Sequence, residues 1–243
     1  MEQKYFAIIA APFVGSFLGV VIRRLPAGDE IVAARSRCDH CGTVLGPRDL
    51  VPLLSWAKAR GRCRHCGAGL GWFYPVIELA AIAVAVSSVV AHGGDPARLW
   101  LDCFLGWTLL AIAWIDIEHL ILPDILTLPL LLAGLAVAGW EAPGRLGDHA
   151  LAAACGYLLF RGIAYFYRRL RGRDGLGEGD AKLLAAGGAW LGLLSLDMLI
   201  LVAAGIGLTG AALQWLGGKP LDGASTVPFG AALALALFAL RLI

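Results

Sequence analysis

The feature that most constrains this chain is the repetition of apolar stretches along nearly its whole length. A helix needs about 20 mostly apolar residues to cross the hydrocarbon core of a bilayer. Hydrophobic residues make up 59% of the chain, charged residues only 16%, and the mean hydropathy is +0.75. This composition excludes an ordinary soluble domain. We therefore predict an all-α polytopic membrane bundle of about eight transmembrane helices, near residues 5–22, 71–91, 98–115, 121–139, 149–167, 180–194, 197–216 and 226–242.

The positive charges predict how this bundle is oriented. Arg23 and Arg24 follow the first apolar stretch instead of preceding it, and no small-residue cleavage site is evident, so we expect an uncleaved anchor. With the amino terminus outside, most of the 20 Lys and Arg residues fall in segments that face the cytoplasm. The net charge of +2 says little about partners. Anionic lipid headgroups explain the basic segments, and we expect no nucleic-acid partner.

A polar and basic segment separates the first two stretches and contains four of the six cysteines. They form two C-x-x-C pairs, each followed by a glycine, Gly42 or Gly67, that allows a tight turn. Two such pairs can surround one Zn²⁺ ion with tetrahedral geometry. His40 and His65 lie inside the pairs and are possible substitute ligands. The predicted metal ligands are Cys38, Cys41, Cys63 and Cys66.

Disulfides or redox-active thiols are the alternative interpretation of these cysteines. The expected cytoplasmic location disfavours disulfides. A shell of four thiolates leaves no position for water or substrate, so we expect a structural ion. Such a small segment cannot bury a core of its own and needs a metal to hold it together. We expect a first helix at 1–22, a zinc-binding domain at 23–70 and a membrane-embedded catalytic core at 71–243. Cys103 and Cys155, within apolar stretches, are expected to be small hydrophobic residues.

Two aspartates are predicted to reach the same depth in the membrane from different helices. The third stretch ends in "WIDIEHLILPD", which contains Asp116, and the sixth begins in "GLGEGDAK", which contains Asp180. Both ends fall on the cytoplasmic side of the predicted topology. A charge inside a bilayer costs about 2.5–3.5 kcal/mol on insertion scales, so carboxylates there need a reason.

Two neighbouring carboxylates can share one proton, and such a pair can hydrolyse an amide. One member takes a proton from water while the protonated member polarises the carbonyl oxygen. Gly177 and Gly179 are expected to allow backbone conformations closed to other residues and to leave room for an extended peptide. Asp180 would also meet the positive end of the helix that follows it.

Other interpretations of these carboxylates stay open from the residues alone. The glycines could form a simple turn with Asp180 as the helix N-cap. Glu118 and Asp124 compete with Asp116 for the partner role, although helix N-capping explains Asp124 well. Glu78 lies near the same membrane interface, and no role follows for it.

Four motifs in order resemble the bacterial prepilin peptidases, also called type IV leader peptidases. "GEGDAKLLAAGGAWLG" is similar to their GxGD signature, and "WIDIEHLILPDILTLPLLLAGL" to their first aspartate motif. The cysteine segment through "WFYPVIELAA" resembles their cytoplasmic cysteine domain, and "VPFGAALALA" their last span. The resemblance covers nearly the whole chain.

This resemblance implies a specific activity. Such enzymes remove the leader peptide of type IV prepilins and pseudopilins at the cytoplasmic face of the inner membrane, and many then methylate the new amino terminus with S-adenosylmethionine. Carried over by position, Asp116 and Asp180 are the catalytic residues, and the four cysteines are metal ligands. The segments "RDLVPLLSW", "WFYPVIE" and "CDHC" depart from the usual pattern, which bears on methylation and substrate preference.

Two other classes of function remain as alternatives. A proton-coupled transporter could use intramembrane aspartates and glycine-broken helices, but it should show internal repeats, and none is convincing. A non-catalytic membrane scaffold with a zinc loop would not need Asp116 and Asp180. The oligomeric state does not follow from the sequence.

Overall fold

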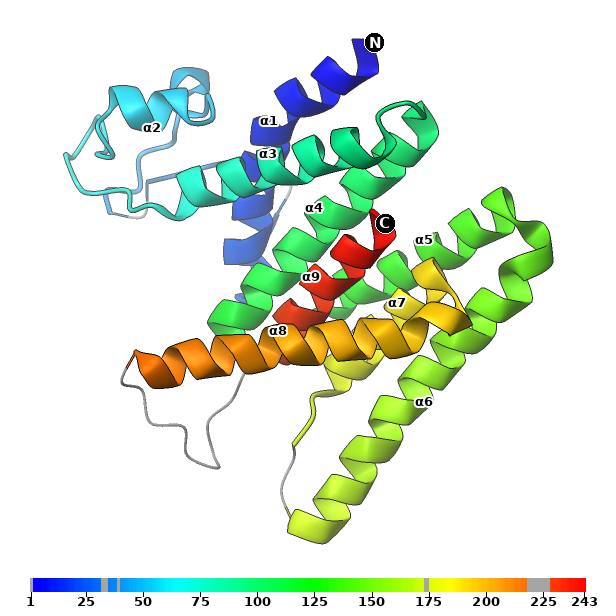
Figure 1. Cartoon of the computed structure of the whole chain (residues 1–243). Helices are drawn as coiled ribbons and strands as arrows, with labels where there is room; N and C mark the ends of the chain where they lie inside the picture. Colours follow the sequence, from blue (N-terminus) through cyan, green and yellow to red (C-terminus); the bar gives the residue numbers. More distant parts are fainter. Residues whose placement is uncertain (1, 32–34, 39, 173–174, 218–227) are drawn as a thin grey trace. The chain divides into compact units, whose positions relative to one another are not determined.

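The computed structural model describes residues 2–31, 35–38, 40–172, 175–217 and 228–243 (Figure 1). Over these residues the chain is helical and contains no β-strand. Two isolated β-bridges, Arg37 with Val44 and Arg62 with Gly69, lie in the segment that carries the cysteine pairs. The predicted all-α class is therefore confirmed.

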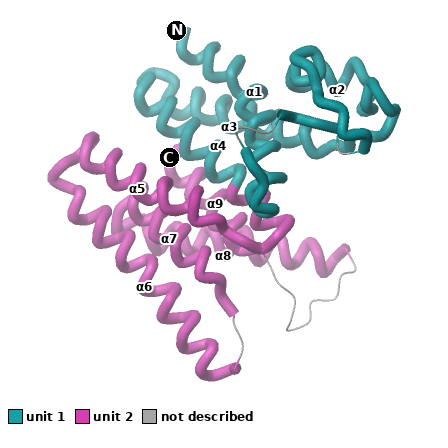
Figure 2. Tube along the Cα trace, turned by 180° about the vertical axis from the view of Figure 1, so that it is seen from behind, with its two compact units in different colours: residues 1–111 teal, residues 112–243 magenta. Residues whose placement is uncertain are grey.

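The chain divides into two compact units, Met1–Ala111 and Ile112–Ile243 (Figure 2). The first unit contains α1 (Glu2–Arg24), α2 (Leu54–Lys58), α3 (Phe73–His92) and the first part of α4 (Pro96–His119). The second contains the end of α4, then α5 (Asp124–Glu141), α6 (Leu146–Arg171), α7 (Glu178–Leu191), α8 (Leu196–Leu216) and α9 (Phe229–Arg241).

Close packing of α1 on α3 organises the first unit. A Cβ atom at Gly15 would lie 2.7 Å from the Cα atom of Glu78, and one at Gly19 would lie 2.8 Å from the ring of Tyr74. Neither glycine could therefore carry a side chain without moving α3. Small residues of this kind let membrane helices approach closely and gain dispersion contacts along their length.

The short helix α7 is the core of the second unit. Ten of its 14 residues are buried, from Asp180 to Trp190. A Cβ atom at Gly188 would lie 2.6 Å from the backbone of Ala152 in α6, and one at Gly134 of α5 would lie 2.7 Å from the Trp190 ring. The indole N–H of Trp190 donates to the carbonyl oxygen of Leu130 at 2.9 Å. The neighbouring helices thus fix α7, together with Asp180 in its first turn.

All eight predicted apolar stretches form helices in the residues described, although residues 226 and 227 of the last one lie outside them. In the described part of the chain, six helical segments are long and apolar enough to cross a membrane; they lie at Glu2–Arg24, Phe73–His92, Pro96–His119, Asp124–Glu141, Pro143–Arg171 and Leu193–Leu216. The helices α7 and α9 have 14 and 13 residues and are shorter than this criterion requires. The structure is that of a multi-pass membrane protein, but it does not confirm the predicted count of eight spans.

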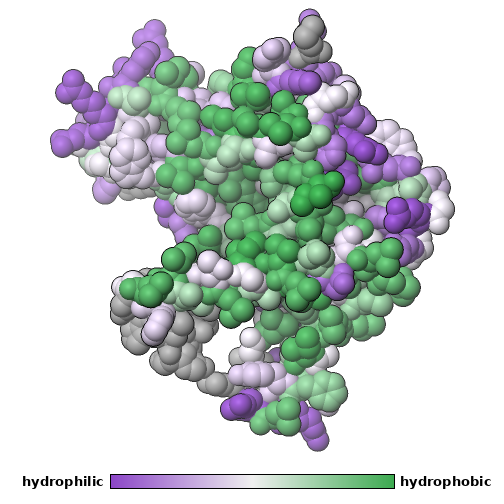
Figure 3. All heavy atoms as spheres, viewed as in Figure 1, coloured by the Kyte–Doolittle hydropathy of each residue, from purple (hydrophilic) through white to green (hydrophobic). Residues whose placement is uncertain are grey.

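The helix surfaces suit a lipid environment. Many large apolar side chains are exposed, including Val90 at 82% and Leu208 at 72%. Hydrophobic residues cover much of the face in Figure 3, while hydrophilic residues gather over the segment that carries α2. Exposed apolar surface on this scale would make a protein poorly soluble in water, which agrees with the membrane-spanning helices.

Candidate functional site: a carboxylate pair and a four-cysteine cluster

Asp116 lies in the last turn of α4, and its side chain meets the start of α9. Asp116 is only 5% exposed. Its Oδ2 atom accepts a hydrogen bond of 2.8 Å from the backbone N–H of Ala231. The first N–H groups of a helix have no partner within the helix and carry the positive end of its dipole. The start of α9 therefore both satisfies this buried carboxylate and attracts its negative charge.

Asp180 occupies the third position of α7 and is 8% exposed. Its Oδ2 atom accepts a hydrogen bond of 3.2 Å from the backbone N–H of Gly177, the N-cap residue. This is the backbone-directed half of a capping box. The alternative in which Asp180 itself is the N-cap is thus wrong, because the helix begins two residues earlier, at Glu178.

The structure brings Asp116 and Asp180 together within the second unit. Both carboxyl groups are buried there, close enough for the negative charge of Asp116 to act on Asp180. The side chain of Leu122, which follows α4, packs against the glycines beside both aspartates. Cβ atoms at Gly179 and Gly230 would lie 2.6 and 2.8 Å from it. We call Asp116 and Asp180 the carboxylate pair.

The glycines before Asp180 serve a different purpose from the one expected. Gly177 has a φ of −66°, and Gly179 lies inside α7 and is not among the glycines with positive φ. The expectation of backbone conformations closed to other residues is therefore wrong. These positions need glycine because there is no room for a side chain. A Cβ at Gly177 would lie 3.1 Å from Asp180 Oδ2, and the Leu122 side chain packs directly against Gly179.

Asp124 is engaged elsewhere. It is the first residue of α5, after Pro123 at the N-cap, and it makes no side-chain cap, so the N-cap expectation is wrong. Both of its carboxylate oxygens accept from the Lys182 ammonium, at 2.8 and 2.9 Å. Glu118 accepts from the Trp114 indole at 2.9 Å. The structure thus favours Asp116 as the partner of Asp180.

The four cysteines lie in the first unit, in the cysteine loop, which we define as residues 35–72. Each pair forms the same turn. The N–H of Gly42 donates to the Cys38 carbonyl at 2.8 Å, and the N–H of Gly67 donates to the Cys63 carbonyl at 2.9 Å. Gly42 and Gly67 have φ values of +68° and +74°, so the expected glycine turns are confirmed. In this conformation a side chain would be strained.

The sulfur atoms fit a single tetrahedral metal ion. All four Sγ atoms lie within 4.8 Å of one another, and those of Cys38 and Cys66 are 4.0 Å apart. Zinc–sulfur bonds of about 2.3 Å place tetrahedral sulfurs about 3.8 Å apart, close to this spacing. All the cysteines are free thiols, so the disulfide alternative is wrong. Neither His40 nor His65 joins the cluster among the residues described.

Hydrogen bonds already favour thiolates in part of this cluster. The Cys41 thiol contacts the Thr43 hydroxyl at 3.3 Å, and this contact lowers the pKa of Cys41 to about 6. Backbone N–H groups of Cys66 and His65 lower the pKa of Cys63. The thiolate is the form that binds a metal ion, so Cys41 and Cys63 suit zinc, whereas burial and the neighbouring thiols raise the pKa of Cys66 to about 11 in the absence of a metal.

The sequence did not reveal the N-terminus of α9 as part of the site. Gly230 and Ala231 lie in the last apolar stretch, and no polar residue lies next to them to draw attention to this position. The one feature of the sequence that could have indicated this contact is the glycine at position 230. In the structure a Cβ there would lie 3.0 Å from Asp116 Oδ2.

Together, these helices and the buried carboxylate pair define a class: a polytopic membrane protein with an acidic pair inside its helix bundle. Residues 9–92 match the family model for the bacterial peptidase A24 N-terminal domain, and residues 103–213 match that of the type IV leader peptidase family. No solved structure gives a significant match.

Several similar proteins are named prepilin leader peptidase/N-methyltransferase. That of Burkholderia pseudomallei (strain 1026b) is 40% identical over 259 residues, covering 96% of this chain and 82% of the relative. That of Aeromonas hydrophila is 37% identical over 262 residues, covering 96% and 88%. That of Pseudomonas aeruginosa is 33% identical over 253 residues, covering 94% and 86%. The chain therefore belongs to the type IV leader peptidase family and is a peptidase. The resemblance found in the sequence is confirmed.

Proposed function

We propose that this chain is a membrane aspartic endopeptidase that removes the leader peptides of type IV prepilins and pseudopilins, with Asp116 and Asp180 as its catalytic residues. One observation carries the proposal: two carboxylates, 5% and 8% exposed, are buried near each other in the same helix bundle, on either side of Leu122. Carboxylates are costly to bury in a membrane protein and are functional there by default. The family supplies the class of substrate.

The pair can break an amide bond by sharing one proton. The ionised carboxylate takes a proton from water as the water oxygen attacks the scissile carbonyl carbon, and the other carboxyl group donates its proton to the carbonyl oxygen. When the tetrahedral intermediate collapses, the C–N bond breaks, the leaving amine takes the proton that the first carboxylate gained from water, and a hydroxyl of the intermediate gives its proton back to the second carboxylate as the new carboxyl group forms. The pair then holds one proton again.

The hydrogen bonds indicate which member starts the reaction ionised. Asp116 accepts the shorter bond, 2.8 Å from Ala231, against 3.2 Å from Gly177 to Asp180. Charge-assisted hydrogen bonds shorten and strengthen as the acceptor becomes negative. We expect Asp116 to be the base and Asp180 the acid. Gly177 and Gly179, which border Asp180, belong to the active-site loop in this proposal.

The proposed location is the bacterial inner membrane, with the amino terminus outside and with the cysteine loop and carboxylate pair at the cytoplasmic face. Basic residues in the last turn of α6, Arg168, Arg169 and Arg171, would lie on that side, in agreement with the positive-inside rule. The proposed organisation remains a first helix at 1–22, a zinc-binding domain at 23–70 and a catalytic core at 71–243. Membrane lipid and the leader peptides are the expected partners.

Two further groups belong to the proposal. Cys38, Cys41, Cys63 and Cys66 would hold a structural Zn²⁺ ion that fixes the loop and takes no part in the chemistry. The names of the relatives imply S-adenosylmethionine, which would supply an electrophilic methyl group for the new amino terminus.

The test is mass spectrometry of a prepilin incubated with the purified protein in lipid. Asp116→Asn and Asp180→Asn should each reduce leader removal by about 10²–10⁴-fold, the usual contribution of acid–base catalysis. Asp197→Asn, at an exposed carboxylate in α8, is the control and should cleave normally. Normal cleavage by either variant of the pair would refute the proposal.

A further inference from the structure

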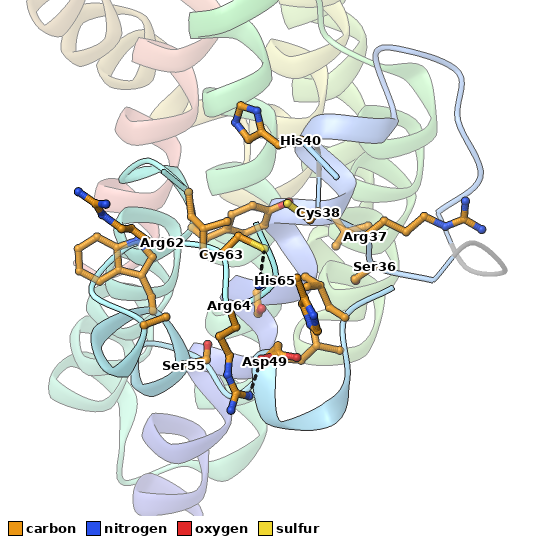
Figure 4. Close-up of a pocket in the computed structure, with 18 of the residues that line it drawn as sticks. Ser36, Arg37, Cys38, His40, Asp49, Ser55, Arg62, Cys63, Arg64 and His65 are labelled. Carbon is orange, nitrogen blue, oxygen red and sulfur yellow. Dashed lines mark hydrogen bonds and ion pairs between the residues drawn. The ribbon is translucent and has the colours of Figure 1, made fainter. Parts of the chain in front are cut away.

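The first unit contains a cavity that the proposed peptidase reaction does not use. Its volume is about 570 Å³, and its walls come from the cysteine loop, from α1 and Asp29 after it, and from the start of α3 (Figure 4). Sites for small molecules and cofactors have volumes of about 300–1,000 Å³ and combine apolar walls with a few placed polar groups. This cavity has both the size and the mixed lining of such a site.

A buried carboxylate lines the cavity. Glu78 of α3 is 4% exposed, and its Oε2 atom accepts a hydrogen bond of 2.8 Å from the backbone N–H of Leu53. The Ser16 side chain also hydrogen-bonds to it. Over the part of the chain that the structure describes, no Lys or Arg forms an ion pair with Glu78. A buried carboxylate with only neutral donors is costly, and a cationic ligand would offset that cost.

An aromatic ring in the same lining is held rigidly. The indole N–H of Trp56 donates to the Gly71 carbonyl at 2.9 Å, and its ring packs against Trp72 with centroids 4.4 Å apart. Gly61, with a φ of +67°, lies against the ring, since a Cβ there would be 3.0 Å away. A ring fixed before a ligand arrives loses little entropy on binding.

Positive charge surrounds the cavity. Arginines 23, 24, 37, 62 and 64 line it, against the carboxylates of Asp29, Asp49 and Glu78. Arg64 is paired with Asp49 at 2.9 Å, whereas Arg37 and Arg62 lie on opposite sides of the cavity in Figure 4, with their side chains turned outward. A ligand with a carboxylate would be attracted to this rim.

The ligand class follows from these three features, and the inference rests on the proposed function. S-adenosylmethionine combines a sulfonium cation, a flat adenine ring and a carboxylate. We propose that the cavity is the binding site for this methyl donor, with Glu78 facing the sulfonium centre, Trp56 contacting the adenine, and the rim arginines attracting the carboxylate. Carboxylates and aromatic faces both attract such cations.

The test is a binding measurement on the purified full-length protein, by calorimetry, with S-adenosylmethionine and its demethylated product S-adenosylhomocysteine. Glu78→Gln keeps an oxygen that can accept from Leu53 but removes the charge. It should weaken binding of the methyl donor about tenfold, or about 1.4 kcal/mol. Binding of the product, which has no sulfonium charge, should change less than about twofold. If Glu78 has only a structural role, the substitution should weaken binding of both ligands equally. That result would overturn the assignment of Glu78 to the sulfonium centre.

Trp56→Leu should weaken binding of both ligands, because both contain adenine. Trp140→Leu, at an exposed tryptophan of α5, and Glu2→Gln, at the exposed start of α1, are the matched controls and should bind as the unchanged protein does. If the unchanged protein binds no donor, or if the Glu78 and Trp56 variants bind as it does, the cavity is not the donor site.

Leader removal on the same samples separates this inference from the proposed function. Asp116→Asn should lose cleavage but keep donor binding, since Asp116 does not line the cavity. If the Glu78 and Trp56 variants bind the donor normally and the protein still cleaves and methylates its substrate, the cavity is not the donor site. The proposed activities would then stand.

Discussion

At the scale of single residues, Gly179 controls how Asp180 is placed. We predict that Gly179→Ala lowers the rate of leader removal by about tenfold to 10²-fold, because a misplacement of about 1 Å can cost that much in a catalytic group. The added Cβ would lie 2.6 Å from the Cβ of Leu122. Helix propensity alone would favour alanine by about 1 kcal/mol, but overpacking costs about 1–3 kcal/mol and should win. Cleavage assays and thermal unfolding would measure both effects.

Gly162→Ala in α6 is the matched control for this substitution. No atom lies within 4 Å of a Cβ at Gly162, so the change should leave activity intact and slightly raise stability. If Gly179→Ala cleaves as fast as the unchanged protein, contact with Leu122 does not position the carboxylate pair.

At the scale of elements, the cysteine loop depends on its metal ion. We predict that the protein purifies with one zinc ion per chain and that the double substitution Cys38→Ser, Cys41→Ser removes it. The altered loop should become more sensitive to protease, because a segment this small has little core of its own. Metal analysis by mass spectrometry, with Cys155→Ser in α6 as the control, checks the outcome. A protein free of zinc under reducing conditions would contradict it.

Acid should release this zinc. Protons compete with the metal for thiolates, so affinity falls as pH falls. The pKa of Cys41, lowered to about 6 by Thr43, keeps this ligand ionised down to that pH. We expect zinc retention to decline as the pH falls, and Thr43→Ala, which removes the hydroxyl, to shift the decline to higher pH. A colorimetric zinc indicator would follow the release, and identical curves for the two proteins would exclude a role for Thr43.

The sequence predicted these elements unequally well, for physical reasons. Helices and glycine turns depend on local patterns, so the apolar stretches and the Cys-x-x-Cys turns emerged correctly. Asp124 was misassigned because Pro123 takes the N-cap and Lys182, distant in the sequence, takes the carboxylate. The hydrogen bond from Ala231 to Asp116 joins residues 115 positions apart. Such contacts depend on packing, which no local pattern encodes.

At the scale of the whole molecule, the number of membrane crossings depends on whether α7 and α9 span the bilayer. Contacts within the second unit bear on both helices. At 14 and 13 residues they measure only about 20 Å, against a hydrocarbon core of about 30 Å. Nevertheless, α7 packs along α5, and α9 packs along α7. Near their starts, Lys182 of α7 pairs with Asp124 of α5. At their ends, Arg241 of α9 lies 3.7 Å from Glu141 of α5 and 5.5 Å from the Trp190 ring of α7.

Helices that extend over the same length of the bundle as a spanning helix must cross the membrane with it. We therefore predict eight crossings and both termini on the outer side. Alkaline phosphatase, which is active only outside the inner membrane, should be active when fused after Ile243 and inactive when fused after Gly172. A fluorescent protein that matures only in the cytoplasm should give the opposite pattern. Fluorescence after Ile243 would mean that α7 or α9 turns back within the membrane, because an odd number of crossings places the two termini on opposite sides.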